Sequence, residues 1–217
     1  RETLASLLSK LAFRFSDVRR KVSENISEKT EYVFPAFMDL EYFRRPVNLK
    51  RKKIILFAGV LEKVKRVDLL IDVFSGLSSH NLSEYRLIIA GEGSCRKELE
   101  MLCRKKGIAD RVDFAGKVDR KCLKDLYYRS ELLVLPSYSE GFGRVVAEAA
   151  VCGCKVLVSE KCGITERLNQ KNVFSGREDM KKKLMDLLDS KNSLSSGIEC
   201  MTDEEFISGM KSLFLSS

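Results

Sequence analysis

Short, mostly apolar runs alternate with helix-forming segments along most of this chain, and this alternation limits the folds open to it. The runs lie at 54–58, 85–90, 112–116, 132–136 and 155–159. The run at 54–58 is apolar throughout, which is typical of a parallel strand covered by helices on both faces of its sheet. The alternation therefore predicts βαβ units and a doubly wound parallel sheet of the Rossmann-like α/β class.

Segments with helical spacing separate the expected strands. Ser94 is expected to cap a helix whose Leu99 and Leu102 face the core. The other helices are expected at 68–77, 123–128, 145–152 and about 178–188. Right-handed crossovers then place the loops that follow the strands along one edge of the sheet, where ligands bind in such folds.

The two ends of the chain do not follow this alternation. A capped helix start is expected at 16–22 and an extended segment at 32–35. A polar bridge leads to a terminal helix that opens at Thr202 with capping-box character. The expected division is 1–45, 46–190 for the Rossmann-like domain, and 191–217 for the bridge and terminal helix.

A formal net charge of +8 favours an anionic ligand. A nucleotide, nucleic acid or an acidic membrane surface would each fit, although basic runs are most often solvated faces. Aromatic and basic residues do not interleave as they do in RNA-binding sheets, so nucleic acid is not expected. No signal peptide is expected, and no apolar run comes near the roughly 18 to 20 residues that span a bilayer. A cytoplasmic protein is expected, with peripheral membrane contact left open.

The seven cysteines are odd in number and include no C-x-x-C pair. Most stand where a small apolar residue fits, so buried, reduced thiols of a cytosolic protein are expected. The alternative is a metal site made by Cys152, Cys154 and Cys162, but their spacing is not that of a zinc site and a fourth ligand is missing.

The segment 139–148 carries the strongest functional signal. It follows the apolar run at 132–136 and precedes a helix-competent segment, so it predicts a strand, a glycine-bearing turn and a helix N-terminus that binds anions. Gly141 and Gly143 let the backbone approach a ligand closely. Glu140 and Glu148 flank the turn with seven residues between them. The simpler alternative is that Glu148 only pairs with Arg144 on an exposed helix face.

This arrangement resembles the E-x7-E motif of retaining glycosyltransferases with two Rossmann-like domains (GT-B), of the group 1 or family 4 type. Residues 136–143 resemble the family's P-S-x-x-E-G-F-G, and Glu148 and Gly153 fall in its E-A-x-x-x-G. Residues 163–166 resemble its G-G-x-x-E, and either shape a wall of the donor pocket or simply start a helix with an acidic first turn. The resemblance covers roughly residues 30–217.

The loop at 59–66 resembles the family's G-R-L-x-x-x-K-G, whose Arg and Lys clamp the diphosphate of the sugar donor. Gly59 and Lys65 stand at the corresponding glycine and lysine positions. Val60 replaces the arginine, which removes a bidentate donor. Arg66 stands where glycine is usual, and it either compensates for the lost arginine or leaves the site weakened.

Two further loops resemble donor-contacting segments of the family. Gly91 and Gly93 resemble its G-x-G turn, although glycines after a strand can be present only because a tight turn requires them. Residues 114–118 resemble an F-x-G-x-v stretch in which the backbone, here at Lys117 and Val118, reads the nucleotide base. This readout leaves the base unnamed, so the donor is a UDP-, GDP- or ADP-sugar.

The resemblance also assigns roles. Glu148 would accept hydrogen bonds from the ribose hydroxyls, and Glu140 would hold the hydroxyls of the donor sugar. The N–H groups around Phe142 and Gly143 would bind phosphate, and Lys65 would add positive charge there. Glu140 and Lys65 would thus be the catalytic residues. Relatives need no metal, which fits the lack of a D-x-D pair at a strand end, so no cofactor and no metal ligand are expected.

The expected function is that of the donor-binding, C-terminal half of a hexosyltransferase-type enzyme that retains configuration and transfers sugar to a glycan or lipid-linked acceptor. Residues 1–45 would be a remnant of the first domain and the linker. Most of the acceptor domain would then be missing from the chain or belong to a partner, and the isolated chain is expected to be inactive. The alternative is a non-catalytic, nucleotide-sugar-binding subunit that completes a separate acceptor-domain partner. A related epimerase or phosphorylase fits less well.

Overall fold

The chain is built around a six-stranded sheet in which all neighbouring strands run parallel. The computed structural model describes residues 20–21, 32–33, 40–43, 50–79 and 82–189. The strand order is β5-β4-β3-β6-β7-β8. These strands are β3 (Ile54–Ala58), β4 (Arg86–Ala90), β5 (Val112–Gly116), β6 (Leu132–Leu135), β7 (Lys155–Ser159) and β8 (Val173–Phe174).

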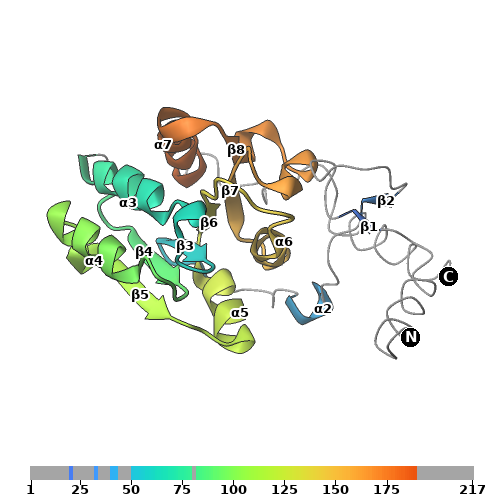
Figure 1. Ribbon diagram of the computed structural model, residues 1–217, viewed down its shortest axis with the longest axis horizontal. Coiled ribbons are helices and arrows are strands. Elements are labelled where there is room, and N and C mark those ends of the chain that lie inside the picture. The colour runs from blue at the N-terminus through green and yellow to red at the C-terminus, as the bar shows by residue number, and fades with distance from the viewer. Residues whose placement is uncertain (1–19, 22–31, 34–39, 44–49, 80–81, 190–217) are drawn as a thin grey trace, which may run out of the picture.

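Helices cover both faces of this sheet (Figure 1). One group has α3 packed against α4 and α7, and the other has α5 packed against α6. The five helices are α3 (Val67–Ser75), α4 (Arg96–Lys105), α5 (Arg120–Arg129), α6 (Arg144–Val151) and α7 (Gly176–Leu188). The central strands β3 and β6 are apolar and buried along their whole lengths, as expected where helices cover both faces of a sheet.

Smaller elements join or extend these layers. The short helix α2 (Leu40–Phe43) contacts α6. A separate two-stranded parallel sheet is formed by β1 (Arg20–Lys21) and β2 (Tyr32–Val33). Five 3-10 helices complete the described chain: η1 (Lys63–Lys65), η2 (Gly76–Ser79), η3 (Ala109–Arg111), η4 (Gly163–Arg167) and η5 (Gln170–Asn172).

The doubly wound α/β fold expected from the sequence is confirmed. Three strands, β3, β5 and β7, have the bounds predicted for them, and β4 and β6 differ by one residue at one end. Each helix expected between residues 50 and 189 is present, although α5 is longer than the predicted 123–128 because it begins after the capping residue Asp119. The bounds of the three predicted domains stay predictions, and the terminal helix from Thr202 lies outside the described residues.

Two local predictions are wrong. Ser94 does not cap α4: Cys95 holds that position without a side-chain cap, and the Ser94 hydroxyl donates instead to Glu62 at 2.9 Å. A helix start was expected at 16–22; its two described residues, Arg20 and Lys21, instead form a strand paired with Tyr32–Val33, and the rest of that segment lies outside the described residues. The extended conformation expected at 32–35 is confirmed for Tyr32 and Val33, and the other two residues lie outside the described residues.

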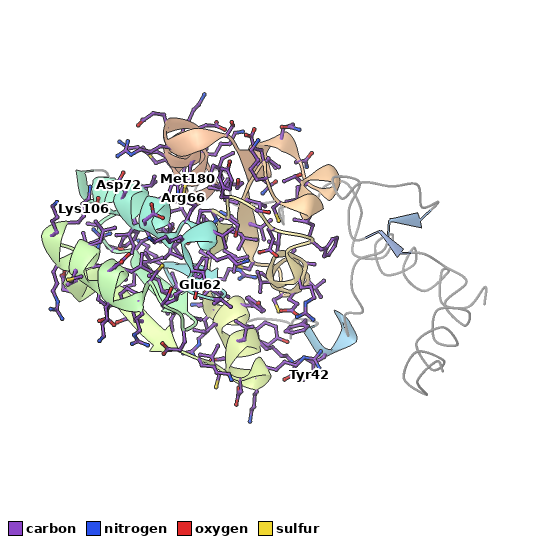
Figure 2. The ribbon with its side chains drawn as sticks, in the orientation of Figure 1. Tyr42, Glu62, Arg66, Asp72, Lys106 and Met180 are labelled. Atoms are coloured by element: carbon purple, nitrogen blue, oxygen red, sulfur yellow. The ribbon has the colours of Figure 1, made fainter. Side chains whose placement is uncertain are left out.

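Asp72 on α3 ties together three helical elements on one face of the sheet. Its carboxylate accepts hydrogen bonds from Lys106, at the end of α4, and from Arg177 on α7. Asp72 and Lys106 lie at the same side of the molecule in Figure 2. The hydrogen bond from Lys106, then that from Arg177, lowers the pKa of Asp72.

We expect Asp72→Asn to lower the free energy of unfolding by about 1 kcal/mol at neutral pH. Because the pKa of Asp72 is lowered by folding, this stabilisation is present above the unfolded value of about 3.9 and is lost as the pH falls through the folded value. Urea denaturation between pH 3 and 7 measures it. Asp186→Asn on α7 is the control, since Asp186 is exposed. A difference from wild type that does not change with pH would contradict this role.

The described helices include none that is both long and apolar enough to cross a bilayer.

Candidate nucleotide-sugar site

The strand order shows that the winding of the sheet reverses between β3 and β6. From β3 the chain winds outward through β4 to β5, then crosses back to β6 and winds the other way. In open parallel sheets of this kind, ligands bind beyond the carboxyl ends of the strands where the winding reverses. The loops that follow β3 and β6 therefore border the candidate site, and they contain the residues singled out at 59–66 and 139–148.

Lys65 and Glu140, the two predicted catalytic residues, meet at this point. The Lys65 ammonium donates a hydrogen bond to the Glu140 carboxylate and forms an ion pair with it. Their side chains are 19% and 21% exposed, so the pair is accessible to a ligand but partly desolvated. Two residues 75 positions apart are thus brought together by the reversal of winding.

Backbone hydrogen bonds fix the loops that carry this pair. The N–H of Tyr138 donates to the carbonyl of Val64 at 2.7 Å, which joins the two loops directly beside the pair. On the other side, the N–H of Gly163 donates to the Glu140 carbonyl at 3.1 Å. The segment 163–166 therefore begins a 3-10 helix, η4, and its first residue also supports the Glu140 loop.

The N-terminus of α6 lies directly after this loop. Gly143 is its N-cap residue and has φ +79°, a conformation that favours glycine. A Cβ there would also lie 2.8 Å from the Cys162 sulfur. No acceptor among the described residues faces the N–H groups of Phe142 and Gly143. They directly precede the positive end of the α6 dipole, and a helix N-terminus of this kind favours the binding of an anion.

Glu148 is half-buried on α6, one turn beyond Arg144. Its carboxylate accepts a hydrogen bond from the Tyr127 hydroxyl at 3.0 Å. Burial raises the pKa of Glu148, opposed by the Tyr127 hydrogen bond and by the charges of Arg144 and Arg120. The alternative of a simple surface pair with Arg144 is therefore wrong, because Glu148 is not on an exposed face.

The two glycines of the 91–93 turn allow close packing of backbone on backbone. A Cβ at Gly91 would lie 1.8 Å from the Gly59 carbonyl oxygen, and one at Gly93 would lie 2.4 Å from that of Leu61. Hydrogen bonds from Gly59 N–H to Ala90 and from Leu61 N–H to Glu92 join the same loops. This packing explains why both positions are glycine, and their contact with the donor stays a prediction.

The segment after β5 lies at the same edge of the sheet. Gly116 ends the strand with φ +68°, and the ion pair of Glu92 and Arg96 lies over it. Lys117 is exposed and Val118 is partly buried against the core. Their predicted role in reading the base is compatible with this place at the edge of the sheet.

Val60 and Arg66 lie on the loop after β3. Val60 is 54% exposed, so its apolar side chain faces solvent where the resemblance expects an arginine. Arg66 has φ +50°, the only described non-glycine residue with positive φ, and its guanidinium pairs with Asp68 at 3.4 Å. It lines a cavity of about 320 Å³ at the starts of α3 and α4, together with Glu62. Donor binding by Arg66 stays a prediction.

The described cysteines are free thiols. All but Cys122 are buried, and burial raises the pKa of Cys152, Cys154 and Cys162 to about 12. Within the described residues, no three His, Cys, Asp or Glu side chains lie together as metal ligands would. The expected buried thiols are confirmed for five of these six cysteines, and Cys200 lies outside the described residues.

Sequence reasoning missed Tyr127 as a functional-site residue. It lies 21 positions before Glu148 and on a different helix. The pair Tyr127–Tyr128 reads as part of the apolar face of α5, and nothing in the sequence marks which of the two hydroxyls reaches a carboxylate. The direct joining of Val64 to Tyr138 was missed for the same reason, because loop–loop contacts have no local sequence signature.

Solved structures share this architecture. The C-terminal domain of LpcC, a group 1 glycosyltransferase of Francisella tularensis, matches 80% of this chain and 97% of its own, with a TM-score of 0.67 and 18% identity. Anabaena HepE in complex with UDP and glucose matches 96% of this chain and 63% of its own, with a TM-score of 0.70 and 17% identity. The fold is that of the C-terminal domain of a GT-B glycosyltransferase.

The sequence comparison identifies the family within that class. The model for "Glycosyl transferases group 1" matches residues 39–199, so the chain belongs to the group 1 glycosyltransferases. An uncharacterized glycosyltransferase of Methanocaldococcus jannaschii is 39% identical over 126 residues, which cover 57% of this chain and 32% of that protein. The resemblance inferred from the E-x7-E motif is thus confirmed at the level of the family.

Two other relatives have more specific names. The D-inositol 3-phosphate glycosyltransferase of Xylanimonas cellulosilytica is 32% identical over 152 residues, covering 61% of this chain and 36% of that protein. The phosphatidylinositol N-acetylglucosaminyltransferase gpi3 subunit of Schizosaccharomyces pombe is 32% identical over 146 residues, which cover 66% of this chain and 32% of that protein. The chain spans about a third of the length of these curated relatives.

Proposed function

We propose that this chain is the donor-binding half of a glycosyltransferase that transfers a hexose from a nucleoside diphosphate sugar and retains its configuration. The observation that carries the proposal is the meeting of Lys65 and Glu140 where the winding of the sheet reverses, directly before the N-terminus of α6. A cation and a carboxylate lie there, directly before the N–H groups at the start of a helix. Glu148 completes the set from the second turn of α6.

Each group has a part in the proposed reaction. Lys65 and the N–H groups of Phe142 and Gly143 bind the diphosphate and stabilise the negative charge that develops as it departs. Glu140 accepts hydrogen bonds from the sugar, and Glu148 accepts them from the ribose, since a carboxylate offers acceptors only. The acceptor hydroxyl attacks on the face from which the diphosphate leaves, and the departing phosphate oxygen takes its proton.

The charge at the diphosphate comes from the protein in this proposal. Lys65 supplies a positive charge there, so the reaction as proposed needs no metal ion or other cofactor. Gly59, Arg66, Gly91, Gly93, Lys117 and Val118 belong to the loops that would surround the donor. Because Val60 brings no charge, Lys65 carries more of the diphosphate binding than a lysine that shares it with an arginine.

The acceptor is proposed to be a glycan or lipid-linked molecule. The relatives in Xylanimonas and Schizosaccharomyces are named for inositol 3-phosphate and phosphatidylinositol, so phosphate-bearing acceptors are known among similar proteins. An acceptor domain, in the same or in a partner chain, would close the cleft. Without it, the isolated chain is proposed to bind nucleotide but to transfer little sugar. The cytoplasmic location stays a prediction.

We expect calorimetric titration of the chain to show selective binding of UDP, GDP or ADP, weakened at least about tenfold by Glu148→Ala. The loss follows from removing a charged hydrogen-bond acceptor, worth roughly 1.5–3 kcal/mol. Glu178→Ala is the control, because Glu178 is exposed on α7 and pairs with Arg177. If no nucleotide binds to the folded chain, the donor-binding proposal is wrong, and a scaffold subunit becomes the better explanation of Val60.

A further inference from the structure

Tyr127 holds the carboxylate of Glu148 from the neighbouring helix. Its hydroxyl donates to Glu148 Oε2 at 3.0 Å, and its side chain is completely buried. Burial, and then the charge of Glu148, raises the pKa of Tyr127, so the hydroxyl keeps its proton and stays a donor. One carboxylate oxygen of Glu148 is thus already engaged in the free chain.

The ring of Tyr127 is fixed from behind by α2. The ring of Phe43 lies 6.0 Å from it, centroid to centroid, and is itself 1% exposed. The Cys152 thiol, just after α6, donates to the Phe43 carbonyl at 3.1 Å. The guanidinium of Arg120 lies 5.2 Å from the Phe43 ring centroid. Helices α2, α5 and α6 therefore converge on Tyr127, and its hydroxyl has little freedom to turn away.

The charged form of Glu148 needs this support. Its own burial favours the protonated form, and the charges of Arg144 on α6 and Arg120 on α5 oppose that effect. Cys152 and Cys154 near this pair stay neutral thiols because burial raises the pKa of each to about 12, and the charge of Lys124 on α5 also acts on Cys152. The Tyr127 hydroxyl is the hydrogen-bond donor that favours the carboxylate, and it also sets the direction of the two oxygens.

We propose that Tyr127 is a positioning residue that orients Glu148 and keeps it ready to accept the ribose hydroxyls of the donor. This inference rests on the proposed function, because it takes Glu148 to be the ribose-binding carboxylate. With Oε2 held by Tyr127, the free oxygen Oε1 and the remaining lone pair of Oε2 face the ligand in a fixed arrangement. Nucleotides that carry ribose hydroxyls gain from this arrangement, and nucleotides that lack them do not.

The test compares two ligands on the full 217-residue chain. The affinity of whichever of UDP, GDP and ADP binds best is measured beside that of its 2′,3′-dideoxy analogue, for wild type and Tyr127→Phe. We expect Tyr127→Phe to reduce the preference for the ribose form by about 3- to 10-fold, the effect of one hydrogen bond, and to leave the affinity for the dideoxy form unchanged. An unchanged preference in Tyr127→Phe would overturn the proposal.

Tyr85→Phe is the matched control. The Tyr85 hydroxyl also donates to a glutamate, Glu131, at 2.7 Å, and its side chain is 4% exposed. This pair lies at the start of β6, the opposite end of that strand from the candidate site. Tyr85→Phe thus removes a similar tyrosine–glutamate hydrogen bond but should leave the ribose preference as in wild type. An equal change in both variants would show a general loss of structure and overturn the positioning role.

A second readout does not depend on the ligand. Nuclear magnetic resonance of the Glu148 carboxyl carbon reports its pKa, which should rise further in Tyr127→Phe and stay as in wild type in Tyr85→Phe. Because ribose binding needs the carboxylate, the affinity for the ribose nucleotide should then begin to fall at a higher pH. An unchanged Glu148 pKa overturns the inference. A wild-type chain that binds ribose and dideoxy forms equally would instead overturn the ribose-binding role of Glu148 in the proposed function.

Discussion

Gly91→Ala is expected to lower the free energy of unfolding by about 3 kcal/mol or more. The added Cβ would lie 1.8 Å from the carbonyl oxygen of Gly59, and that oxygen is backbone that no side-chain rotation can move. The loops after β3 and β4 would have to separate, which would break hydrogen bonds such as that from Gly59 N–H to Ala90 at 3.0 Å. Gly91 also has φ +150°, which other residues rarely adopt.

Gly107→Ala separates the two causes of this loss, the clash of the added Cβ and the positive φ. Gly107 has φ +68°, but no atom lies within 4 Å of the position of its Cβ. Its substitution should cost only the left-handed conformation, about 1 kcal/mol. Urea denaturation of both variants measures the difference. Similar stabilities for the two would show that the loops after β3 and β4 separate easily, contrary to the packing described.

Most of the fold was predictable because its strands carry local signals. The run 54–58 is apolar throughout and is followed by glycine, and it became β3 with those bounds. Strand β8 was not predicted, because Val173–Phe174 is only two residues long and lies between polar segments. The strand order was also beyond local reasoning, since β3 pairs with β6 across a large part of the chain.

The candidate site was predictable where a motif marked it and not where a tertiary contact makes it. Lys65 and Glu140 were selected by their motif positions alone, and the structure brings them together. Tyr127 had no such mark, because its ring is an ordinary core residue and only its hydroxyl reaches Glu148. At Ser94 a local signal was misleading. A serine suits helix capping, but its hydroxyl donates instead to Glu62, in a loop more than 30 positions earlier.

The ion pair of Lys65 and Glu140 predicts opposite effects for the removal of its two charges. Lys65→Met should weaken the binding of the preferred nucleoside diphosphate by about 10- to 100-fold, the effect of a charged hydrogen bond to phosphate. Glu140→Gln should strengthen it by about 3- to 10-fold, because the ammonium no longer binds a competing carboxylate and the diphosphate meets one negative charge fewer. The pair is partly desolvated, so salt should weaken both effects without abolishing them.

A comparison of the free nucleoside diphosphate with the sugar nucleotide separates the proposed sugar contact of Glu140 from a general effect of its charge. Glu140→Gln should bind the free nucleoside diphosphate better than wild type. For the sugar nucleotide it should gain less, or lose affinity, because it removes the carboxylate proposed to accept hydrogen bonds from the sugar. Lys63→Met is the control for charge, since Lys63 is exposed on the same 3-10 helix as Lys65. Calorimetric titration of each variant with both ligands measures these changes. If Glu140→Gln weakened the free diphosphate as much as Lys65→Met does, the carboxylate would not compete for the ammonium but would hold it in its binding position.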